Sequence, residues 1–225
     1  MKVSQSSPCK ILSIICLAVF STFIFLGCAS EHPEADIQTY CEAVAHLDDA
    51  SAKKLKISTD DIKNTSLKQA RQTMSMMAQG AKDNGQLSNL CDTMYNTMKR
   101  LNIKTELVSK TSDTAKVKVT TDYIDYGELV RTAAPKIQAE ITANSDEIMA
   151  LPREQQMSKV LDYSSKCLID ALNSAEVKGQ QSFEVDCKLD KDLNMWIPEQ
   201  TSSFEKNLVN NMLFPQGNQD TSSAQ

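Results

Sequence analysis

The chain has 225 residues, with 24 basic and 29 acidic side chains and a formal charge of −5 at pH 7. It contains no basic run and no alternation of basic with aromatic residues, which argues against a nucleic-acid partner. With only six glycines, it also lacks the glycine-rich loops that bind nucleotide phosphates. A chain of this length is suited to a single domain.

The first thirty residues predict export from the cytoplasm. Lys2 and Lys10 precede an apolar run from Ile11 to Leu26, and the first acidic residue is Glu31. A basic start, an apolar stretch and a small residue before the cut are typical of an export signal. The run is shorter than the roughly 20 apolar residues of a membrane-spanning helix, which disfavours an uncleaved anchor.

The end of this run, Gly27-Cys28-Ala29, resembles a bacterial lipobox, although Phe25 stands where the pattern usually has leucine. The resemblance implies cleavage before Cys28 and attachment of diacylglycerol to its thiol. We therefore expect a signal peptide at 1–27, a tether at 28–33, one domain at 34–214 and a disordered tail at 215–225. Without the signal the chain has 22 basic and 29 acidic residues, a formal charge of −7. An acidic body is repelled by an anionic membrane, so attachment must come from the lipid.

Hydrophobic periodicity predicts helices in the first half of the chain. Apolar residues recur at helical spacing over 34–49, from 59 to a stop at Asn84-Gly85, and over 88–101. Two further helices are expected at 128–149, where Pro135 should introduce a kink or a restart, and at 153–175. A short helix over 203–214 should end the domain.

Strands are predicted where the period changes from 3.6 to 2. Ala115, Val117 and Val119 alternate with polar residues over 115–123, and 103–109 supplies the partner strand through a turn at Ser112-Asp113. A second hairpin is expected from 183–189 and 195–197. The fold class is therefore α+β, with N-terminal helices packed on a curved antiparallel sheet of two hairpins separated by two inserted helices.

Several of these features together resemble a family of uncharacterised bacterial lipoproteins with a ketosteroid-isomerase-like, or SnoaL-like, cone domain of the cystatin-like type. They are the lipobox at Cys28, the Lys/Thr-rich strand at 113–119, the two inserted helices, and the Trp196-Ile197 strand followed by a short helix. The helical insert is longer than this fold usually has. The resemblance implies a pocket between the sheet and the helices.

Four cysteines remain after the signal is removed and Cys28 is lipidated: Cys41, Cys91, Cys167 and Cys187. An even number outside the cytosol indicates disulfides, although buried thiols are the alternative and three connectivities exist. Inward positions on the predicted elements favour the pairs Cys41–Cys91 and Cys167–Cys187. A zinc site is not expected, because no cysteine spacing or histidine fits one.

The candidates for catalysis are few. Asp122, Tyr123, Asp125 and Tyr126 cluster at the end of the 115–123 strand, but strand alternation sends Asp122 outward and Tyr123 inward, so we expect no convergence. His46, near the apolar stripe of the first helix, is expected to be a surface or hydrogen-bonded residue. No serine nucleophile motif occurs.

The sequence therefore predicts a lipid-anchored protein of the bacterial cell envelope that acts as a non-enzymatic binding or accessory module, without a cofactor or metal. Its partner would be an unknown protein or small-molecule ligand. The alternative hypothesis is a small-ligand carrier or enzyme that uses a cone-fold cavity. A cavity lined by convergent carboxylate, tyrosine and histidine side chains would favour that alternative, whereas an interior filled by Met, Leu and Val would favour the binding module.

Overall fold

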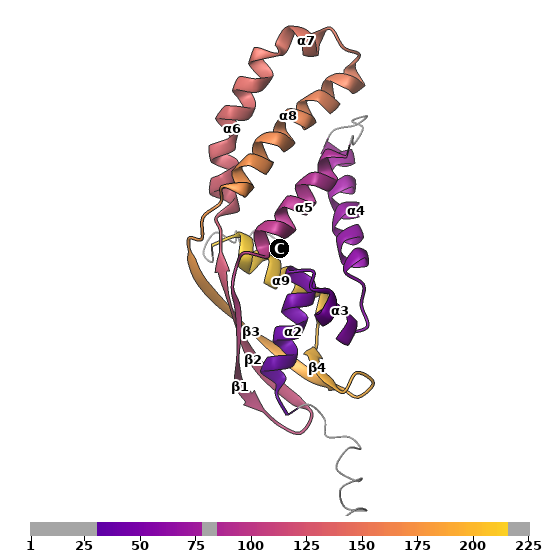
Figure 1. Ribbon diagram of the computed structural model, residues 1–225, viewed down its shortest axis with the longest axis vertical. Coiled ribbons are helices and arrows are strands. Elements are labelled where there is room, and N and C mark those ends of the chain that lie inside the picture. The colour runs from indigo at the N-terminus through magenta and orange to yellow at the C-terminus, as the bar shows by residue number, and fades with distance from the viewer. Residues whose placement is uncertain (1–30, 78–84, 216–225) are drawn as a thin grey trace, which may run out of the picture.

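The computed structural model describes residues 31–77 and 85–215 (Figure 1). The predicted signal peptide, Cys28 and the tail from residue 216 lie outside the described residues. The helices are α2 (Pro33–Ala45), α3 (Asp49–Lys54), α4 (Thr59–Met77), α5 (Gln86–Met98), α6 (Tyr126–Ala143), α7 (Ser145–Met149), α8 (Arg153–Asn173) and α9 (Thr201–Leu213). The strands are β1 (Ile103–Lys110), β2 (Thr114–Tyr123), β3 (Gly179–Asp190) and β4 (Met195–Pro198).

The four strands form one antiparallel sheet in the order β1-β2-β3-β4. Val119 of β2 lies opposite Thr105 of β1 and Phe183 of β3, so the two hairpins join along β2 and β3. Helices α6, α7 and α8 are inserted between the hairpins. The α+β class, with two hairpins separated by inserted helices, is confirmed.

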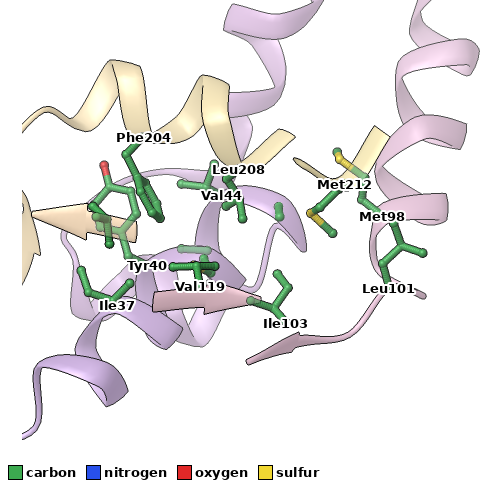
Figure 2. Packing of buried hydrophobic residues seen from close by; sticks show 14 of the residues in the cluster. Ile37, Tyr40, Val44, Met98, Leu101, Ile103, Val119, Phe204, Leu208 and Met212 are labelled. Atoms are coloured by element: carbon green, nitrogen blue, oxygen red, sulfur yellow. The ribbon is translucent and has the colours of Figure 1, made fainter. Parts of the chain in front are cut away.

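Helices α2 and α9 cover one face of the sheet. The residues of β2 that alternate inward are fully buried, with Val117 and Val119 both 0% exposed. Figure 2 shows Val119 beside Ile37 and Tyr40 of α2, with Leu208 of α9 nearby. The pocket expected from the cone resemblance would occupy this space, and core side chains fill it instead.

The other face of the sheet is polar. Lys116 of β2 forms ion pairs with Asp186 at 2.8 Å and with Glu184 at 3.6 Å, both on β3. Thr120 and Ser182 share a hydrogen bond of 2.8 Å between their hydroxyls. This pattern is typical of an antiparallel sheet with one solvated face.

Two helical projections extend from the body (Figure 1). Helices α6 and α8, joined by α7, form an arm in which α8 packs against both α6 and α5. Helices α4 and α5 form a second pair, held by the Lys63–Asp92 ion pair and by a 2.8 Å hydrogen bond between the hydroxyls of Ser66 and Tyr95.

Several predicted boundaries differ from the structure by a few residues, and two of these differences have a clear physical cause. The first helix ends at Ala45 rather than at residue 49, because Leu47 adopts a left-handed conformation with φ of 49° and Asp48 starts α3 by accepting the N–H of Ser51 at 2.7 Å. Helix α6 runs through Pro135, and the break falls at Asn144 instead. Proline has no N–H, so the backbone carbonyl oxygen one turn before it lacks its usual helical donor. Because Pro135 is exposed, water can hydrogen-bond to that oxygen instead.

The predicted disulfides, Cys41–Cys91 and Cys167–Cys187, are wrong, because none of these cysteines is disulfide-bonded in the structure. Cys41 faces the sheet from α2 and lies near Cys187 of β3, and both are 0% exposed. Cys91 lies on α5, which packs mainly against α8 and α4, whereas Cys167 faces α6 in the arm. The two cysteines of each predicted pair are therefore buried or half-buried in different places, one at the interface of α2 with the sheet and the other between helices.

Candidate binding groove

An open groove of about 1010 Å³ lies between α4 and α9. The buried side chains of Tyr40 and Val44 of α2 and Tyr95 of α5 lie at its base, and the loop 56–58 also lines it. Its apolar lining residues are Val44, Ile57, Ile62 and Val209. Its polar lining residues are Tyr40, Lys56, Ser58, Asp61, Thr65, Ser66, Gln69, Tyr95, Ser202, Glu205, Lys206 and Asn210.

Hydrogen bonds fix the polar groups at the base of the groove. The hydroxyl of Tyr40 donates to Oε1 of Glu205 at 3.1 Å, which joins α2 to α9. The hydroxyls of Tyr95 and Ser66 lie 2.8 Å apart and join α5 to α4. Both tyrosine side chains are anchored by packing, with exposures of 7% and 8%. Apolar surface with a few fixed polar groups is typical of a binding site.

The tyrosines of the groove are neutral hydroxyls. Burial raises the pKa of Tyr40, and the negative charge of Glu205 raises it further. Burial also raises the pKa of Tyr95, although the hydrogen bond between Tyr95 and Ser66 opposes this effect. Neither hydroxyl is therefore activated as a base or nucleophile, and both are suited to hydrogen bonding with a bound molecule.

Asp122, the first of the sequence candidates for catalysis, has a structural role. It lies on the outer face of β2, as alternation predicted, but it is only 5% exposed rather than solvated. Its Oδ2 accepts the backbone N–H of Asn102 at 3.0 Å and the Asn102 side-chain amide at 2.6 Å, and its Oδ1 accepts Gln180 Nε2 at 2.8 Å. Burial alone raises the pKa of this carboxyl, but the hydrogen bonds from Gln180 and Asn102 outweigh burial and hold it below its ordinary value.

The other three candidates have separate partners. Asp125 caps α6 by accepting the N–H of Glu128 at 2.8 Å. The ring of Tyr126 packs edge-on against Phe214, with 5.9 Å between ring centroids. The ring of Tyr123 covers Gly179, where an added Cβ would lie 3.3 Å from a ring carbon. The sequence cluster therefore does not converge on a common point.

His46 is hydrogen-bonded, as the sequence predicted. Its Nε2 lies 3.1 Å from the carbonyl oxygen of Leu101. It lines a shallow pocket of about 430 Å³ with Glu42, Asp48 and Lys99. Within residues 31–77 and 85–215, no three His, Cys, Asp or Glu side chains are grouped as metal ligands. In the same part of the chain, every helix is too short or too polar to cross a bilayer.

The sequence of the chain matches no known family model. No curated protein is significantly similar to it. Its structure resembles the crystal structure of a candidate lipoprotein, ycdA, from Bacillus subtilis subsp. subtilis str. 168. The TM-score is 0.63 and 16% of residues are identical, over 81% of this chain and 56% of that chain. This chain therefore spans little more than half the length of its structural neighbour.

At this level of identity the likeness shows a shared fold and nothing finer. The neighbour is described as a lipoprotein, and it gives no support to the SnoaL-like cone domain suggested by the sequence. That resemblance rested on the lipobox, an alternating strand, the two inserted helices and the Trp196-Ile197 strand, and alternating strands of this type occur in many folds.

No motif in the sequence marks the groove. Its walls come from α4 and α9, which are far apart in the chain, and its residues are ordinary polar and apolar helix residues without a motif. The one local signal is the pair Glu205 and Val209, four residues apart on α9, which mark a half-buried face beside the fully buried Phe204 and Leu208.

Proposed function

We propose that this protein is a lipid-anchored component of the bacterial cell envelope whose α+β domain binds a partner protein through the groove between α4 and α9. The anchor is the lipid on Cys28, and the domain lies outside the cytoplasm. The observation that carries the binding role is the groove itself, which combines apolar surface with hydrogen-bonding groups held in place by packing.

The lining favours an amphipathic peptide segment. Ile57, Ile62 and Val209 offer apolar contacts, and Ile57 is 37% exposed at the rim. Glu205 uses Oε1 to accept from Tyr40, while Oε2 has no hydrogen-bond partner among the described residues. A segment with an apolar side chain and a nearby N–H or O–H donor would contact the apolar residues and also donate a hydrogen bond to Oε2 of Glu205.

A non-enzymatic role is proposed because the residues best suited to acid–base chemistry are committed elsewhere. Asp122 accepts three hydrogen bonds, Asp125 caps a helix, and the interior between the sheet and α2 is filled by core side chains. The alternative, a carrier or enzyme with a cone cavity, has no comparable observation in its favour.

Photo-crosslinking in intact cells tests the binding role. A photoreactive residue at position 65, an exposed threonine on the wall of the groove, should give a discrete adduct with one protein. Val209→Trp, which fills the groove, should abolish that adduct. Position 106, exposed on β1 away from the groove, is the matched control and should give none.

Two results would reject the groove as the binding site. One is an adduct at position 65 that persists in the Val209→Trp variant while the protein remains folded and exported. The other is equal labelling at positions 65 and 106.

A further inference from the structure

The first described residues are fixed to one end of the sheet. Lys110, the last residue of β1, donates from Nζ to the carbonyl oxygen of Glu31 at 2.8 Å. Thr105 Oγ1 donates to the carbonyl oxygen of Glu34 at 2.7 Å. Residues 31–34 therefore belong to the folded body and leave little chain to act as a flexible tether.

Very little chain separates this fixed point from the predicted lipid. Glu31 follows Cys28 by three residues, which span at most about 10 Å when fully extended. A diacylglycerol on the thiol places Cys28 at the level of the lipid headgroups. The end of the sheet that holds Glu31 is therefore close to the membrane surface.

Both hairpin turns lie at this same end. The turn between β1 and β2 covers 111–113, and Asp113 accepts the N–H of Leu189, near the end of β3, at 3.3 Å. The turn between β3 and β4 covers 191–194, since Asp190 pairs with Met195. We call Glu31 and these two turns the membrane-proximal end.

The arm of α6, α7 and α8 points the other way. Figure 1 shows α7 and the start of α2 at opposite ends of the long axis of the molecule. Strand β2 has 10 residues and α6 has 18, which correspond to roughly 30 Å of strand and 27 Å of helix. Met149, at the end of α7, is 68% exposed at the far tip.

We propose that the lipid bilayer is the partner of the membrane-proximal end, so that the anchored domain stands upright with its two hairpin turns on the membrane and its helical arm directed away. The arm tip is then held on the order of 50 Å from the headgroups. This inference rests on the proposed lipidation of Cys28.

Fluorescence quenching in reconstituted vesicles tests the orientation. The lipidated full-length protein is labelled at position 112 in the β1–β2 turn or at position 146 in α7, through a non-natural amino acid that spares the native cysteines. The vesicles contain phosphatidylglycerol and phosphatidylethanolamine, with a fraction of lipid bearing a nitroxide on the headgroup. We expect strong quenching at position 112 and none at position 146.

A tether variant supplies the matched control. Insertion of ten glycine and serine residues after Ser30 adds a flexible chain with a mean span of about 17 Å. Quenching at position 112 should fall markedly in this variant, with position 146 unchanged.

The outcomes separate the two proposals. Equal quenching at both positions, in protein whose mass shows the lipid on Cys28, overturns the orientation and leaves the anchored lipoprotein intact. Absence of the lipid mass overturns the anchor itself, and the orientation with it.

Discussion

The carboxylate of Asp36 accepts a hydrogen bond from the backbone N–H of Trp196, with 2.9 Å between Oδ2 and N. The two residues are 160 positions apart, and the bond joins the first described helix to the last strand of the sheet. Trp196 is only 1% exposed, and the Nζ of Lys110 lies 5.5 Å from the centroid of its ring. The contacts of Trp196 with Asp36 and with Lys110 therefore hold α2, β1 and β4 together near the start of the domain.

Asp36→Ala is expected to destabilise the domain by about 1–3 kcal/mol, because it removes the carboxylate that accepts the N–H of Trp196 beside a buried ring. Urea unfolding followed by fluorescence measures this change directly, since Trp196 is the single tryptophan of the chain. Glu140→Ala, which removes an exposed carboxylate on α6, is the control and should change the free energy of unfolding by less than about 0.5 kcal/mol. Equal stability of the two variants would contradict a structural role for Asp36.

Asp122→Asn is expected to lower stability at pH 7 by about 1–3 kcal/mol, because hydrogen bonds to a buried charged acceptor are weakened. The pKa of Asp122 is lowered in the folded state, so its contribution to stability is complete above the unfolded pKa of about 3.9 and is lost as the pH falls through the folded value. The variant should therefore lose less stability than the wild-type protein between pH 7 and strongly acidic pH.

Unfolding curves at several pH values check this second prediction, with Asp146→Asn on the exposed first turn of α7 as the control. If the stability of Asp122→Asn fell more steeply with acid than that of the wild-type protein, the pKa of Asp122 would not be lowered in the folded state.

The core cysteines are expected to be unreactive thiols. Burial raises the pKa of Cys187 to about 12 and also raises the pKa of Cys41, so neither forms the reactive thiolate near neutral pH. Iodoacetamide should label half-buried Cys167 first in the native protein, and all four thiols of the domain only in denaturant. Differential alkylation with mass spectrometry measures this order. Recovery of a disulfide-linked peptide without reducing agent would contradict it.

Cys28→Ala is expected to block signal processing and abolish incorporation of labelled palmitate. In fractionated cells the variant should keep its unprocessed N-terminus, while Cys167→Ala, which leaves the lipobox intact, should be processed and labelled normally. Palmitate incorporation into Cys28→Ala would show that the lipobox interpretation is wrong. In a cell with two membranes, the lipobox resemblance further predicts sorting to the outer one, because Ala29 rather than aspartate follows the cysteine.

The sequence by itself determined most of the elements and the faces they bury, although it did not predict α3. The alternation of Ala115, Val117 and Val119 with lysines predicted β2, and all three are buried in the structure. The same reasoning found the β1 partner strand, the inserted helices and the short last helix within a few residues. These predictions succeeded because periodicity reports directly on burial along one element.

Only the tertiary structure decided which buried faces meet. Cys41 and Cys91 both lie on inward faces, yet α2 packs on the sheet while α5 packs on α8 and α4, so no disulfide joins them. The groove depends on Tyr40 meeting Glu205, 165 residues away, and on Ser66 of α4 meeting Tyr95 of α5. A periodic pattern specifies that a face is buried but not what covers it, because apolar burial is non-directional. The pairing of faces is therefore decided by the packing of the whole chain.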